Sequence, residues 1–245
     1  MRAFPFDVVA FDLDGTLADT APDIAAALNH TLAEIGRRTV APGDISALIG
    51  GGSDSLLARA LALHGEADPA LVDRAVPLYR ARYAANVCVA TRPYPGVVEA
   101  LDALAARGVA LAICTNKTER LTRLLLDALR WTGRFAAIVG ADTLPWGKPD
   151  PRTLGEAIAR AGGGRAVFVG DSITDALTAR AAAVPFVAVS FGYPQGPIEA
   201  LGADAVIDDF AALVGTLERL GGDQSLGDAR LPDGGRNGSS RSLAS

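Results

Sequence analysis

Two carboxylates follow a short apolar segment close to residue 10. Residues 8–11 read Val-Val-Ala-Phe, which is typical of a strand buried on both faces. Asp12 and Asp14 come directly after this segment, followed by a glycine and a threonine. Open α/β sheets bind ligands beyond the carboxyl ends of their strands, so this position favours a ligand site. The alternative is an Asp-Gly turn at a strand end that has no chemical role.

Polar residues also follow two later apolar segments. Thr115 and Asn116 come after residues 109–114, and Asp171 ends an apolar segment that begins at residue 166. Because parallel strands deliver their carboxyl ends to one edge of a sheet, we expect these residues to meet Asp12 and Asp14 there. Lys148 precedes the predicted helix that leads to Asp171, and it can reach the same edge.

This set of side chains suggests metal-assisted chemistry on a phosphate. Clustered carboxylates without His or Cys favour a hard cation with oxygen ligands, and Mg²⁺ is the natural choice. A lysine, a hydroxyl group and backbone N–H groups suit phosphate oxygens. A carboxylate that attacks a phosphate dianion meets a repulsion of about 4 kcal/mol per charge pair at an effective dielectric constant of about 20, which Mg²⁺ and Lys148 would offset. In the alternative interpretation, Thr115-Asn116 is a plain turn and Asp171 only caps a helix.

The elements that position these residues alternate between strands and helices after residue 93. This alternation predicts an α/β fold, a three-layer Rossmann-like parallel sheet with helices on both faces. The predicted strands are residues 8–11, 109–114, 135–139, 166–171, 185–189 and 205–207. The predicted helices between and after them are residues 95–107, 121–129, 151–161, 173–183 and a last helix that ends at residue 220.

The segment between the first two strands has a different pattern, because its apolar residues recur at helical spacing. It predicts a helix that Thr20 caps and that ends at Gly36, and further helices over residues 53–64 and 69–85, with a kink or break at Pro77. We therefore expect an α/β core of residues 1–17 and 90–220, an inserted all-helical cap of residues 18–89, and a disordered tail of residues 221–245, which is rich in Gly, Ser, Asp and Arg.

Composition limits the partners and the location. The chain has 245 residues, 49% hydrophobic, and a formal net charge of -5, so neither nucleic acid nor an anionic membrane would be attracted to its surface as a whole. No apolar run reaches the ~18 residues of a membrane span, and no apolar leader precedes the first strand. We expect a soluble cytoplasmic protein, either a monomer or a homodimer. Only Cys88 and Cys114 are cysteines, so a disulfide framework is not expected.

Lysine is scarce, since the chain contains only Lys117 and Lys148. Lys117 lies in the first turn of a predicted helix, and we interpret it as a surface residue. His30 and His64 lie on predicted helices of the insertion, and we assign them no chemical role.

Four segments together resemble the signatures of the haloacid dehalogenase-like hydrolase superfamily. They are Asp12-Leu-Asp-Gly-Thr-Leu, Thr115-Asn, Lys148-Pro and Gly170-Asp-Ser-x-x-Asp175, in this order. Any one of them is a weak signal, whereas four in order, with a helical insertion after the first strand, are specific. The resemblance extends over about residues 7–215 and implies the same fold.

The resemblance also implies roles for the residues. Asp12 resembles the nucleophile that forms an aspartyl-phosphate, and Asp14 resembles the group that protonates the leaving oxygen and then activates water, with its backbone carbonyl on Mg²⁺. Asp12 and Asp171 would supply carboxylate ligands to Mg²⁺, and Asp175 would support Lys148 or the metal site. The residues that resemble phosphate ligands are Thr115, Asn116 and Lys148.

Several reactions occur in this superfamily, and the sequence discriminates among them. Dehalogenases do not need the second acid, so Asp14 favours phosphoryl transfer. Related phosphonate hydrolases use a cap lysine, and residues 18–89 contain none. β-Phosphoglucomutases have a histidine where this chain has Ile24, which weakens an isomerase assignment.

Residues in and next to the insertion indicate which substrate the protein takes. Residues 19–24, 49–61 and 94–97 resemble bacterial phosphoglycolate phosphatases, which implies 2-phosphoglycolate as the substrate. The alternatives are pyrophosphate, a nucleotide or a sugar phosphate, a sugar-phosphate isomerase, or a non-catalytic phosphate-binding module. Gly50, Gly51 and Gly52 form either a loop that closes over the substrate or a flexible connection, and Arg59 is a candidate partner for a substrate carboxylate.

Overall fold

A six-stranded parallel sheet forms the larger part of the computed structural model, which describes residues 4–65, 68–193 and 195–228. The strand order is β5-β4-β1-β6-β7-β8, and every neighbouring pair is parallel. This arrangement confirms the predicted fold class. The strands are β1 (Val8–Phe11), β4 (Ala110–Cys114), β5 (Ala137–Val139), β6 (Ala166–Gly170), β7 (Phe186–Val189) and β8 (Ala205–Ile207).

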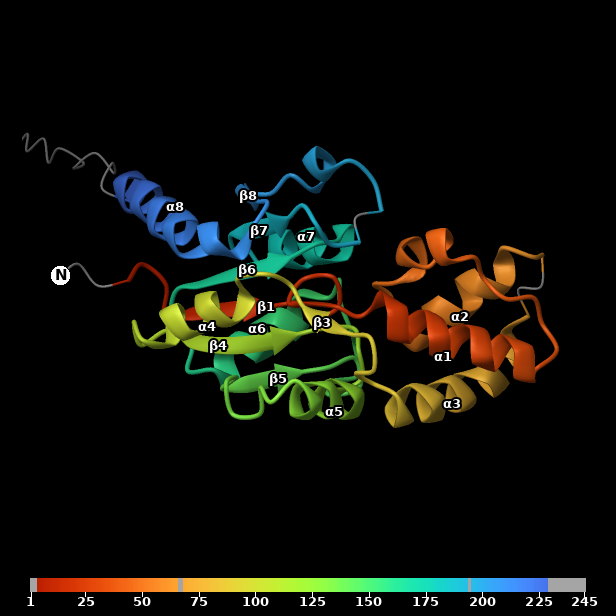
Figure 1. Cartoon of the computed structure of the whole chain (residues 1–245). Helices are drawn as coiled ribbons and strands as arrows, with labels where there is room; N and C mark the ends of the chain where they lie inside the picture. Colours follow the sequence, from red (N-terminus) through yellow and green to blue (C-terminus); the bar gives the residue numbers. More distant parts are fainter. Residues whose placement is uncertain (1–3, 66–67, 194, 229–245) are drawn as a thin grey trace, which may run out of the picture.

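Helices cover both faces of this sheet (Figure 1). Because side chains alternate along a strand, Val9 and Phe11 of β1 pack on one face with Leu101 of α4 and Leu213 of α8. Val8 and Ala10 pack on the other face, against α6 and α7. Full burial of one large apolar side chain contributes about 1.5–3 kcal/mol, so both faces hold the central strands in place. The helices of this layer structure are α4 (Val97–Ala105), α5 (Glu119–Ala128), α6 (Pro151–Arg160), α7 (Ile173–Ala181) and α8 (Leu213–Asp228).

Three helices lie together at one end of the sheet, on the right in Figure 1. They are α1 (Ala21–Glu34), α2 (Gly52–Ala62) and α3 (Pro69–Ala85), with the short 3₁₀ helices η1 (Pro42–Asp44) and η2 (Ser46–Leu48) between the first two. Both α1 and α2 pack against α3. We call residues 21–85 the helical insertion.

Two short strands join the helical insertion to the sheet. β2 (Ala18–Asp19) pairs antiparallel with β3 (Arg92–Pro93), so the chain leaves and re-enters the sheet region side by side. The sequence did not predict this pairing, because two-residue strands are too short to show alternation. The remaining elements are the 3₁₀ helices η3 (Ile198–Leu201) and η4 (Phe210–Ala212).

Three local predictions differ from the structure. The last helix does not end at residue 220 but continues to Asp228, and Gly221 is buried close to Pro5. The predicted tail thus overlaps α8 over residues 221–228, and residues 229–245 lie outside the described part. Pro77 lies inside α3 and does not divide it, whereas the kink stays a prediction. Thr20 is the N-cap residue of α1, but its side chain makes no capping hydrogen bond.

No helix in the described ranges combines the length and apolar character that crossing a membrane requires.

Candidate active site

Three neighbouring strands bring the predicted site residues together. β1 lies between β4 and β6 in the sheet, and all three run parallel. Asp12, Thr115 and Asp171 are the residues that directly follow these strands. All three side chains are buried, with exposed fractions of 6%, 4% and 2%. The sheet therefore places groups from three distant segments at one edge.

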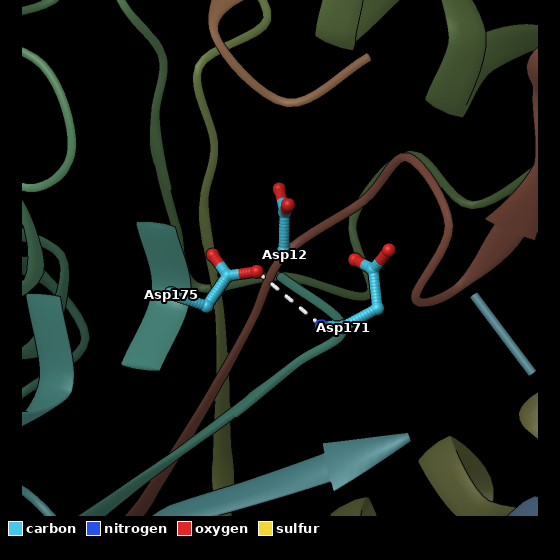
Figure 2. A group of neighbouring side chains, drawn as sticks. All are labelled: Asp12, Asp171 and Asp175. Carbon is cyan, nitrogen blue, oxygen red and sulfur yellow. Dashed lines mark hydrogen bonds between the residues drawn. The ribbon is translucent and has the colours of Figure 1, made fainter. Parts of the chain in front are cut away.

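Asp12, Asp171 and Asp175 form a buried acidic cluster. One carboxylate oxygen from each lies within 4.8 Å of the others, and Figure 2 shows Asp12 between the other two. Burial raises the pKa of Asp12 to about 6; Asp175 and Asp14 add to this rise, and Lys148 opposes it. Burial and the charges of Asp175 and Asp12 raise the pKa of Asp171 well above its usual value.

Such a cluster is suited to a divalent cation. Its donors are carboxylate oxygens, which hard cations prefer, and its charges repel one another in a buried place. A bound cation would offset both the burial and the mutual repulsion that raise the pKa of Asp12 and Asp171. The residues present therefore fit a metal ion of this kind.

The contacts of Asp175 give it a different task from that of Asp171. The Asp175 Oδ1 atom accepts a hydrogen bond of 2.6 Å from Lys148 Nζ. Its Oδ2 atom accepts from the Ser172 hydroxyl at 2.6 Å and from the backbone N–H groups of Ser172 and Asp171. Ser172 and Asp175 form a capping box at the start of α7, so the same contacts begin the helix and fix the carboxylate. Asp175 thus holds Lys148.

Asp171 is held by two residues that the sequence did not indicate. The Thr16 hydroxyl donates to its Oδ1 atom at 2.9 Å, and the backbone N–H of Tyr193 donates to its Oδ2 atom at 2.7 Å. Gly15 passes so close that a Cβ atom there would lie 2.5 Å from the Asp171 Oδ2 atom. Thr16 follows Asp12 in the first signature, which was a usable signal, whereas nothing in the sequence pointed to Tyr193.

Lys148 lies between two of the carboxylates. Its Nζ atom is 3.1 Å from Asp12 Oδ1 and 2.6 Å from Asp175 Oδ1. Burial alone would lower the pKa of Lys148, but the charges of Asp12 and Asp175 outweigh it and raise the pKa. The lysine is therefore a fixed positive charge next to Asp12.

The Asn116 amide connects two loops. Its Oδ1 atom accepts from the backbone N–H of Lys148 at 2.9 Å, and its Nδ2 group donates to the carbonyl groups of Lys148 and Gly50, both at 3.1 Å. A Cβ atom on Gly52 would lie 2.9 Å from the Asn116 backbone oxygen. The glycines of residues 50–52 therefore pack directly on the sheet edge. The resemblance implies a phosphate-binding role for Asn116, and its side chain here joins these two loops.

Asp14 contacts Lys117, which was wrongly predicted to lie at the surface. Lys117 was expected at the surface, but it is only 8% exposed, and its Nζ atom lies 3.0 Å from Asp14 Oδ1. The same atom donates to the Tyr83 hydroxyl of α3 at 3.1 Å. Thr20 also donates to Asp14 Oδ1, at 2.7 Å, which is why its hydroxyl does not cap α1. The helical insertion covers Lys117. The helical periodicity of one segment cannot show that another segment buries it.

A cavity of about 40 Å³ lies between the sheet edge and the helical insertion. One water needs about 10–15 Å³, so the cavity holds only a few water molecules or a small ligand group. Arg59, the candidate from the sequence, is exposed and does not line this cavity. The lining residues are Asp12, Asp14, Ile24, Ile49, Gly50, Gly52, Ser53, Leu56, Tyr79, Tyr83, Thr115, Asn116, Lys117 and Leu121.

Comparison with known proteins agrees with this arrangement. The family model described as haloacid dehalogenase-like hydrolase matches residues 9–189, which is most of the chain. The chain belongs to this family of hydrolases, as its four signatures predicted.

Curated relatives of this chain belong to a narrower group within the family. The chain is 47% identical to a phosphoglycolate phosphatase of Agrobacterium fabrum over 221 residues, which is 89% of this chain and 95% of that protein. It is also 47% identical to a phosphoglycolate phosphatase of Caulobacter vibrioides, over 82% of this chain and 86% of that protein. The crystal structure of a predicted phosphoglycolate phosphatase from Haemophilus somnus is 30% identical and superposes with a TM-score of 0.80, over 86% of this chain and 98% of that one.

Proposed function

We propose that the protein is a Mg²⁺-dependent phosphatase of small phosphomonoesters, and that its substrate is 2-phosphoglycolate. The observation that carries this proposal is the position of Asp12. It is a buried carboxylate that lines the cavity, lies 3.1 Å from the Lys148 ammonium and belongs to the acidic cluster. Relatives of this chain that are named phosphoglycolate phosphatase support the substrate.

In the proposed reaction, Asp12 is the nucleophile. One carboxylate oxygen attacks phosphorus as the bond from phosphorus to the leaving oxygen breaks, which gives an aspartyl-phosphate and the free alcohol. Lys148 offsets the repulsion between the carboxylate and the phosphate, because its ammonium already lies 3.1 Å from Asp12 Oδ1. Thr115 lines the same cavity, and we propose that its hydroxyl donates to a phosphoryl oxygen.

Asp14 is the proposed acid and base. It donates a proton to the leaving oxygen in the first step and accepts one from the attacking water in the second, which returns phosphate and free Asp12. Asp12 and Asp14 both line the cavity, so their carboxylates can face the same substrate. Thr20 and Lys117 hold Asp14 Oδ1 and leave its second oxygen for this transfer.

Mg²⁺ is the proposed metal. Asp12 and Asp171 would hold it through their carboxylates and Asp14 through its backbone carbonyl, while Asp175 is already engaged with Lys148 and Ser172. When bound, the ion supplies positive charge that offsets the charge of the phosphate.

The helical insertion acts as a cap in this proposal. The cavity has a volume of only about 40 Å³, so we propose that the helices move away to admit a substrate. β2 and β3, which run side by side, connect the moving part to the sheet. Closure would exclude bulk water while the phosphoryl group is transferred to Asp12.

A panel of phosphomonoesters tests the proposal. We expect the highest kcat/KM with 2-phosphoglycolate and lower values with pyrophosphate, nucleotides and sugar phosphates. Activity should disappear with a chelator and return with Mg²⁺. Absence of hydrolysis under every divalent metal would favour a phosphate-binding module, and conversion of a sugar phosphate without phosphate release would favour an isomerase.

The proposed location, oligomeric state and partners follow from the sequence. We propose a cytoplasmic enzyme that works as a monomer or homodimer on a soluble metabolite, without nucleic acid, since the net charge is -5. Size-exclusion chromatography with light scattering would give the oligomeric state.

A further inference from the structure

Lys117 is a buried ammonium group for which the proposed reaction has no chemical step. It is 8% exposed and lies at the boundary between the sheet edge and the helical insertion. Among the described residues that line the cavity, it is the only one with a cationic side chain. A buried cation is costly unless an anion compensates it, so its location in a ligand cavity calls for an explanation.

The two lysines of the chain differ in how fully they are compensated. Lys148 contacts two carboxylates, those of Asp12 and Asp175, at 3.1 and 2.6 Å. Lys117 contacts one carboxylate, that of Asp14 at 3.0 Å, and the Tyr83 hydroxyl at 3.1 Å. An ammonium group has three N–H donors, so these two contacts leave one donor of Lys117 for a ligand.

The Tyr83 hydroxyl is a neutral partner. Burial and the nearby carboxylate of Asp14 raise the pKa of Tyr83 well above its usual value, so the phenol keeps its proton. Lys117 also lies over the Tyr83 ring, 4.4 Å from the ring centroid. The side chain of Tyr83 is polarisable but uncharged, so it does not neutralise the charge of the Lys117 ammonium group.

Among the described residues, the rest of the cavity wall offers no competing cation. Apart from the sheet edge and the glycine loop, the wall consists mainly of apolar and aromatic side chains, namely Ile24, Ile49, Leu56, Tyr79, Tyr83 and Leu121. In such surroundings a charge-assisted hydrogen bond is strong, because water does not compete for it. The small volume also limits the ligand to a short molecule.

We propose that Lys117 binds the second anionic group of the substrate, the carboxylate of a small phosphorylated hydroxy acid, while the phosphoryl group lies at Asp12. This inference rests on the proposed function, because it assigns the recognition of the leaving group within the same cavity. It replaces Arg59, which is exposed, as the residue that selects an anionic leaving group.

A pair of substrates of matched size tests the proposal. Ethyl phosphate has the two-carbon leaving group of 2-phosphoglycolate without the carboxylate. In Lys117→Met we expect kcat/KM for 2-phosphoglycolate to fall about 10- to 100-fold more than kcat/KM for ethyl phosphate, as expected for loss of a hydrogen bond between charged groups. Lys117→Arg should recover part of the preference, because it keeps the charge.

Two further variants serve as comparisons. Arg123→Gln removes an exposed cation that pairs with Glu119 on α5, and it controls for a change in net charge. Arg59→Gln tests the other candidate, and a selective loss in this variant would overturn the assignment to Lys117. Circular dichroism and thermal unfolding show whether each variant folds, and Lys117→Gln replaces Lys117→Met if the methionine variant does not.

The outcomes separate this inference from the proposed function. If the unaltered enzyme hydrolyses neither substrate, the proposed function fails. If it hydrolyses 2-phosphoglycolate but Lys117→Met lowers kcat/KM equally for both substrates, Lys117 only positions Asp14 and the inference is overturned. A loss confined to 2-phosphoglycolate supports it.

Discussion

The sheet edge and the helical insertion line the same cavity, but they hold their side chains in different ways. At the sheet edge, the acidic groups are held by hydrogen bonds and ion pairs, as in Asp175 with Lys148 and Ser172. The insertion contributes mostly apolar side chains and a glycine loop. Its polar links to the sheet edge at the cavity include Gly50 with Asn116 and Tyr83 with Lys117.

This difference indicates a division of tasks. A network of buried charges loses much free energy when one partner moves away, so the sheet edge is rigid. A surface of apolar groups with few hydrogen bonds can separate and close again at lower cost. We therefore expect changes at the sheet edge to affect every substrate, and changes in the insertion to affect access and preference.

The largest expected effect is that of Asp12→Asn at the sheet edge. The amide is no nucleophile, and kcat/KM should fall by about 10⁴-fold or more for all substrates. The fold should persist, because burial already disfavours the charge that the variant removes. Steady-state kinetics and thermal unfolding in metal-free buffer measure both quantities. Retained Mg²⁺-dependent hydrolysis would contradict the nucleophile assignment.

A change of intermediate size is expected for Gly52→Ala in the glycine loop. Gly52 has φ of +80°, and an added Cβ atom would lie 2.9 Å from the Asn116 backbone oxygen. We expect about a tenfold loss in kcat/KM, with the size of the loss depending on the substrate, because the loop can no longer approach Asn116.

Gly65→Ala is the matched control for that variant. Gly65 has φ of +75°, and no atom of the described residues lies within 4 Å of a Cβ atom added there. An alanine at this position therefore introduces the same backbone strain without the clash. Both variants should lose about 1 kcal/mol of stability, but only Gly52→Ala should lose activity. Equal activity in the two variants would show that the loop does not need close contact with the sheet edge.

The smallest expected effect concerns the segment that connects the two regions. Asp23 of α1 accepts hydrogen bonds from the backbone N–H groups of Val89, Ala90 and Thr91. Burial raises the pKa of Asp23, but hydrogen bonds from Thr91, Ala90 and Val89 outweigh it and hold the pKa below its ordinary value of 3.8. The stabilisation is thus fully present above pH 3.8 and is lost as the pH falls through the lower folded pKa.

Asp23→Asn should consequently lower Tm at neutral pH by about 2–8 °C, as expected for a loss of about 1–2 kcal/mol, and the difference from the unaltered protein should shrink in acid. Asp54→Asn, which alters an exposed carboxylate that pairs with Arg80, is the control. A difference in Tm that does not change with pH would show that the Asp23 charge has no part in it.

Prediction from the sequence worked best where residue type and chain order carry the information. The apolar segments before Asp12, Thr115 and Asp171 indicated buried strands, and the alternation of strands and helices indicated a parallel sheet. The carboxyl ends of parallel strands share one edge of the sheet, so the sequence alone predicted that these residues lie near one another. The family followed from the same residues.

Prediction failed where the environment comes from another part of the chain. Lys117 looked like a surface residue on its own helix, and only the packing of α3 over the sheet edge buries it. Thr20 looked like a helix cap, but its hydroxyl has a charged acceptor in Asp14. The sequence by itself determined the sheet, the acidic residues at its edge and the family. The tertiary structure decided which charges are buried and paired, because desolvation and hydrogen bonding depend on groups that are distant in sequence and close in space.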